Sequence, residues 1–95
     1  MKDLKETRMA LDQVDREIVR LFEERMGLSR DVAAYKMAHG LPVLDRSREE
    51  IVLQSRCSML EDGHWAPAIR ELYETIMALS RAEQEKMMKE AAENA

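Results

Sequence analysis

Three cationic side chains interrupt or flank the apolar face of one long amphipathic segment. Arg8 and Arg25 occupy steps of the apolar repeat where a hydrophobic residue is expected, and Lys36 lies at the end of the repeat. The repeat proceeds in steps of three, four and seven through Leu4, Leu11, Val14, Ile18, Leu21, Leu28, Val32 and Tyr35. Because a guanidinium removed from water without an anion is strongly destabilised, these cations must either reach solvent or bind a negatively charged group.

The spacing of the cations predicts how an anion would be bound. Arg8 and Arg25 are seventeen residues apart, which is roughly 25 Å along a helix, so one small anion cannot contact both. Arg25 and Lys36 are eleven residues apart, or about 16 Å, and two long side chains can bracket a ligand between them. If two copies pack antiparallel, the Arg8 of one copy approaches the Arg25 and Lys36 of the other, which creates two identical sites.

The segment that carries these cations is predicted to be a helix over residues 4–38. A helix of about 35 residues is roughly 50 Å long, whereas a compact monomer of this size is about 30 to 35 Å across. Such a helix extends beyond its own domain and leaves its apolar face exposed. The length therefore predicts an intertwined antiparallel homodimer in which a second copy covers this face.

Two shorter helices are predicted after the first. Gly40 and Pro42 end the first helix, and Asp45 or Ser47 then caps a second helix over residues 46–60, with Ser47 and Glu50 in capping-box spacing. A polar turn precedes a third helix over residues 66–88, after which the chain is expected to fray. In the third helix Ser80 and Gln84 occupy core-register positions, so polar groups again interrupt an apolar stripe.

Composition favours one all-α domain over residues 1–95. Apolar residues make up 45% and charged residues 36% of the chain, and it contains only three Gly. The net charge of −4 argues against nonspecific nucleic-acid binding. A lone Cys57 excludes an intrachain disulfide and a multi-cysteine metal site, and His39 and His64 lack metal-ligand spacing. No signal peptide or membrane-spanning stretch is evident, so a cytoplasmic location is expected.

The anomalous polar residues form an ordered set along the chain. Arg8 and Arg25 bound the segment RMALDQVDREIVRLFEER, Lys36 follows, Asp45 and Glu49 lie in PVLDRSREE, and a Ser-x-x-x-Gln pair, Ser80 and Gln84, lies in the third helix. In this order and spacing the chain resembles the all-helical (type II) chorismate mutase family over almost its whole length. The resemblance implies an intertwined homodimer of three-helix chains that rearranges chorismate to prephenate, in aromatic amino acid biosynthesis on the shikimate pathway.

The resemblance also implies a role for each residue, without metal, cofactor or covalent intermediate. Arg25 and the partner subunit's Arg8 would bind the two carboxylates of chorismate. Lys36 and Gln84 would donate to the ether oxygen, where negative charge develops as the C–O bond breaks. Glu49 would accept a hydrogen bond from the ring hydroxyl. Asp45 would help to position the hydroxyl end, and Ser80 a carboxylate.

Other interpretations of the same residues remain open. The cations would also suit an isochorismate pyruvate-lyase-like enzyme of the same fold, or a non-catalytic helical dimerisation or regulatory module in which they pair with carboxylates across an interface. Taken alone, Arg8 and Arg25 suit solvated side chains, and Asp45 and Glu49 suit helix caps. Two residues depart from the family pattern: Gly27, near the second arginine, and Arg81, where an apolar residue is expected. Arg48 is interpreted as a local charge partner of the neighbouring acidic residues.

Overall fold

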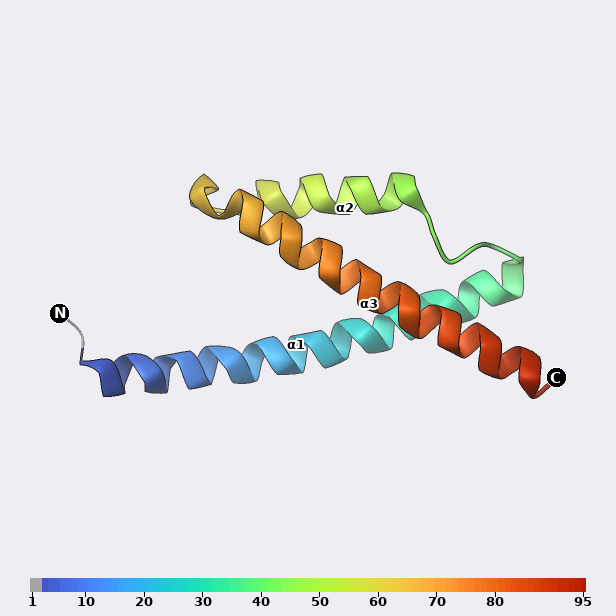
Figure 1. Ribbon diagram of the computed structural model, residues 1–95, viewed down its shortest axis with the longest axis horizontal. Coiled ribbons are helices and arrows are strands. Elements are labelled where there is room, and N and C mark those ends of the chain that lie inside the picture. The colour runs from blue at the N-terminus through green and yellow to red at the C-terminus, as the bar shows by residue number, and fades with distance from the viewer. Residues whose placement is uncertain (1–2) are drawn as a thin grey trace.

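The computed structural model describes residues 3–95, and within this range it contains helices and no strand (Figure 1). The helices are α1 (Leu4–His39), α2 (Arg46–Ser58), the short 3-10 helix η1 (Gly63–Trp65) and α3 (Ala66–Glu93). The predicted all-α fold with a long first helix is therefore confirmed. No helix in the described range combines the length and apolar character needed to cross a bilayer.

The ends of α1 and α2 show which of the expected capping residues cap the helices. Gly40 caps α1 in the left-handed conformation, with φ of 63°, which glycine adopts without steric penalty. Asp45 caps α2, since its side chain accepts a hydrogen bond from the Arg48 backbone N–H at 3.0 Å. Ser47 lies inside α2, so of the two expected caps the structure selects Asp45 and not Ser47.

Two helices end elsewhere than the sequence pattern indicates. α2 stops at Ser58 instead of residue 60, because the chain tightens there: the Met59 N–H donates to the Arg56 carbonyl and the Leu60 N–H donates to the Cys57 carbonyl, each three residues back. α3 continues to Glu93, beyond the expected end at residue 88. The apolar periodicity fades there, but residues 89–93 are Lys, Glu and Ala, which favour helix and include no Gly or Pro to stop it.

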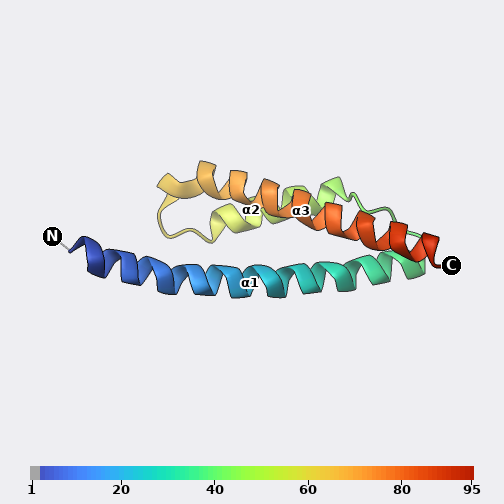
Figure 2. The ribbon, with the colours of Figure 1, turned by 60° about the horizontal axis from the view of Figure 1, so that its bottom comes forward.

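The helices pack as a layer of α2 and α3 over the C-terminal half of α1. α3 contacts both other helices, and it crosses α1 at an angle (Figures 1 and 2). Val52 and Leu53 of α2 and Met77 of α3 form the buried core, with Tyr73 packed against them. Ala33 of α1 is also fully buried. The core is small and leaves the N-terminal half of α1 outside it.

The N-terminal half of α1 diverges from α3 and projects away from the core (Figure 1). Every residue from 8 to 24 is exposed, and all eight members of the predicted apolar stripe of α1 are 46–61% exposed. The radius of gyration is 17.1 Å, against about 12 Å for a compact domain of this length. A single copy therefore leaves a long apolar face uncovered by its own residues.

The cap at Gly40 yields a stability prediction. Gly40→Ala forces a Cβ into a left-handed backbone, and we expect the free energy of unfolding to fall by about 1 to 2 kcal/mol in urea titrations. Gly63→Ala is the matched control, because Gly63 has no positive φ and a Cβ there meets nothing within 4 Å. The control should match or slightly exceed wild type. Equal stability of Gly40→Ala and wild type would contradict the left-handed cap.

Candidate active site

A pocket of about 330 Å³ lies where all three α-helices and the α1–α2 connection converge. Six of the seven site residues expected from the sequence line it, and they come from segments far apart in the chain: Arg25, Lys36, Asp45, Glu49, Ser80 and Gln84. The remaining lining residues are Leu28, Ser29, Val32, Val43, Arg48, Val52, Met77 and Arg81. The volume suits a small organic ligand.

Lys36 and Gln84 are joined in one hydrogen-bond chain. Lys36 Nζ donates to the Val43 carbonyl at 2.6 Å and to Gln84 Oε1 at 3.2 Å. Gln84 Nε2 in turn donates to Ser29 Oγ at 2.9 Å. Because an ammonium has three N–H donors and an amide nitrogen has two, each group retains one donor for a ligand. Gln84 is only 6% exposed, so these contacts hold its amide in one orientation.

Arg25 is held by neutral groups on α3. Its Nη1 donates to Ser80 Oγ at 3.1 Å, and its guanidinium lies 5.9 Å from the centre of the Tyr73 ring. Among residues 3–95, neither Arg25 nor Lys36 forms an ion pair with a carboxylate. Both cations are partly withdrawn from water, yet their charge is not neutralised by a direct contact, which favours binding of an anion.

Among the residues that the structure describes, Glu49 and Arg81 form the only direct ion pair between two residues that line this pocket. Arg81 Nη1 donates to both carboxylate oxygens of Glu49, at 2.5 and 2.6 Å. Arg48 had been expected to be the local charge partner, but its guanidinium makes no such contact, and only its backbone N–H reaches Asp45. The pair with Arg81 forms instead because packing brings α3 against α2.

The charges that line the pocket do not balance. Its lining contains four cationic side chains, Arg25, Lys36, Arg48 and Arg81, and two carboxylates, Asp45 and Glu49. The excess of two positive charges suits a dianionic ligand. Asp45 has an evident structural duty as the α2 cap, so its presence in the lining does not by itself indicate contact with a ligand.

Three pocket contributors were missed in the sequence: Ser29, the Val43 carbonyl and the Arg81 side chain. Ser29 lies seven residues before Lys36, two turns along the same helix face, and this spacing could have identified it. Arg81 was noted only as a departure from the family pattern. Nothing in the sequence marks Val43, because its carbonyl contributes through the path of the connecting chain.

Arg8 does not line this pocket. It lies exposed on the projecting half of α1, seventeen residues before Arg25, or roughly 25 Å along the helix axis. Within one chain the structure therefore separates Arg8 from the other six expected site residues. Its placement agrees with the sequence-based expectation that one anion cannot contact both arginines of the same helix.

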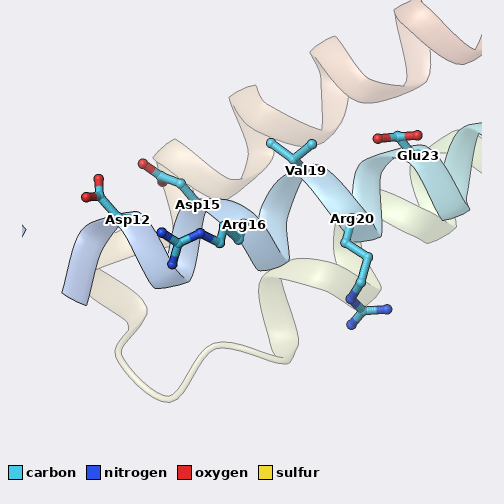
Figure 3. A pocket seen from close by; sticks show the side chains of 6 residues that line it. All are labelled: Asp12, Asp15, Arg16, Val19, Arg20 and Glu23. Carbon is cyan, nitrogen blue, oxygen red and sulfur yellow. The ribbon is translucent and has the colours of Figure 1, made fainter. Parts of the chain in front are cut away.

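A larger hollow of about 650 Å³ lies along α1, but its lining comes from that helix alone. Figure 3 shows its six side chains on one stretch of α1: Asp12, Asp15, Arg16, Val19, Arg20 and Glu23. One of the six, the exposed Arg20, donates a hydrogen bond to Glu17, which raises the pKa of its guanidinium. Its lining residues all come from the exposed N-terminal half of α1, so the hollow is an uncovered helix face and brings together no groups from distant parts of the described chain.

Metal ligands are not gathered in the described range. Among residues 3–95, no group of three or more His, Cys, Asp or Glu side chains is placed to hold a metal ion. The polar side chains that line the pocket are four cations, two carboxylates, two hydroxyls and one amide, and they stand among apolar residues.

Comparison with known proteins identifies the family. Residues 7–85 match the family described as chorismate mutase type II. The T-protein of Haemophilus influenzae is 41% identical over 56 residues, which are 59% of this chain and 15% of that protein. The chorismate mutase of Methanocaldococcus jannaschii is 36% identical over 52 residues, which are 55% of this chain and 52% of that protein. No solved structure matches significantly.

The matches thus span about half or less of the length of these curated relatives. The family match, in contrast, covers most of this chain and extends from α1 through Gln84. The chain therefore belongs to the chorismate mutase type II family.

Proposed function

We propose that this chain catalyses the Claisen rearrangement of chorismate to prephenate. The observation that carries the proposal is that Arg25 and Lys36, two cations without a carboxylate partner in the described chain, share one pocket with the oriented Gln84. In this reaction the ether C–O bond of the enolpyruvyl arm breaks while a C–C bond forms between the arm and the ring. It needs neither a nucleophile nor a proton transfer, so orientation and electrostatics supply the catalysis.

Substrate binding follows from the excess positive charge of the pocket. Arg25 retains donors beyond the one given to Ser80, and a guanidinium binds a carboxylate through two parallel hydrogen bonds. The partner subunit's Arg8 would bind the second carboxylate. Ser80, which already fixes Arg25, would help to position a carboxylate. Two anchored carboxylates hold the arm over the ring in the reactive conformation.

The other polar residues act on the reacting ether and on the ring hydroxyl. Lys36 and Gln84 each have a remaining donor, and these would stabilise the negative charge that develops on the ether oxygen. Glu49 would accept from the ring hydroxyl, and Asp45 would support that end of the pocket. Prephenate formation would place the chain in aromatic amino acid biosynthesis, and the cytoplasmic location expected from the sequence belongs to this proposal.

An intertwined antiparallel homodimer is also part of the proposal, with residues 1–95 of each copy forming one domain. It is supported by the projecting half of α1 and by the eight exposed stripe residues. A second copy that lies along α1 removes this apolar face from water. The same arrangement carries Arg8 toward the pocket of the other copy. Arg8 does not line the pocket of its own chain.

Substitution of Lys36 tests the catalytic role of the pocket. We expect Lys36→Ala to lower kcat for prephenate formation by about 100- to 1,000-fold, since a donor to developing negative charge is lost. Lys86→Ala is the matched control, because Lys86 is exposed on α3 and absent from the pocket lining. Chorismate consumption and product identity are measured together. Pyruvate as the product would favour a lyase, and no conversion by folded wild type would favour a binding module.

Mixing two inactive variants tests the shared site. Arg8→Ala and Arg25→Ala should each lose most activity as homodimers, whereas their heterodimer keeps one site with both arginines intact. Purified heterodimers should therefore regain about half of wild-type activity. Heterodimers that form, as shown by two affinity tags, but stay inactive would contradict the contribution of Arg8 across the interface.

A further inference from the structure

The Glu49–Arg81 ion pair joins α2 to α3 at the edge of the candidate pocket. Its side chains are 24% and 31% exposed, so it is better shielded from water than Arg70–Glu50, which joins the same two helices and is 45% and 52% exposed. Ion pairs gain strength as water is excluded. The Glu49–Arg81 contact is therefore expected to restrain its side chains more than the exposed pair does.

This pair also separates two hollows. Glu49 and Arg81 line the candidate pocket on one side and, on the other, a shallow hollow that Leu44 and Leu53 help to line. The carboxylate of Glu49 is thus held in the wall between them. Arg81 Nη1 occupies one hydrogen-bonding position on each carboxylate oxygen, and further lone pairs remain for a hydroxyl donor.

The cations that line the same pocket indicate where Glu49 would move if Arg81 did not hold it. Arg25 and Lys36 face the same pocket without a carboxylate partner in the described residues. A glutamate released from Arg81 would be attracted to these cations, because opposite charges in a partly shielded pocket attract strongly. Glu49 would then compete with substrate carboxylates for the same donors.

We propose that Arg81 is a positioning residue that holds Glu49 at the pocket wall and keeps it away from the cations that bind the substrate carboxylates. This inference rests on the proposed mutase function and deepens it. Arg81 acts through Glu49, so the effect of Arg81 on substrate binding should depend on the negative charge of Glu49.

A double-mutant cycle in the full chain tests this dependence, with KM for chorismate as the readout. Arg81→Met in the wild-type background should raise KM about tenfold, which corresponds to an interaction energy within the range known for residues in contact. In the Glu49→Gln background, where no carboxylate can be released, the same substitution should change KM less than about twofold. Arg81→Lys keeps the charge and a donor and should stay within about threefold of wild type.

Arg70→Met is the matched control, because it breaks an ion pair between the same helices outside the pocket, and its KM should equal that of wild type. An equal rise in KM in both Glu49 backgrounds would show direct substrate contact by Arg81 and overturn the inference, as would an unchanged KM in the wild-type background. If Arg81→Met does not fold, Arg81→Gln replaces it in the cycle with the same expectations. Wild type that forms no prephenate would instead contradict the proposed function, and the inference with it.

Discussion

A cation that leaves water must find compensating groups, and this constraint organises the pocket. Lys36 finds them in two neutral oxygens, the Val43 carbonyl and Gln84 Oε1, and Arg25 finds one in Ser80 Oγ. Hydrogen bonds to neutral oxygens fix the direction of each cation without cancelling its charge. The pocket is therefore preorganised for an anion, and those oxygens are supplied by α3 and by the connection between α1 and α2.

Helix α1 links the pocket to the proposed homodimer. The C-terminal half of α1 packs on α3 and contributes Arg25 and Lys36, while the N-terminal half is exposed and carries Arg8. An exposed apolar face of this length is unfavourable in water. A second copy along α1 would relieve that cost and bring Arg8 to a pocket, so assembly and ligand binding would depend on one structural feature.

Much of the fold could be predicted because helix signals are local. The apolar periodicity and Gly40 located α1. The expected range of α3 was too short, because that range was taken from the apolar spacing, whereas helix propensity alone sustains the last turns of α3. The site was predicted less completely. Polar residues in an apolar register could be recognised individually, whereas Val43 contributes a backbone carbonyl that no side-chain pattern marks.

The sequence by itself determined the helices, the cap at Gly40 and the set of polar residues that could serve a dianion, because these depend on neighbours within a few turns. Only the tertiary structure decided which groups meet. Glu49 pairs with Arg81, 32 residues away, and not with the adjacent Arg48, and Gln84 is oriented by Ser29, 55 residues away. Such choices depend on how the helices cross, which sets distances between side chains that no local pattern encodes.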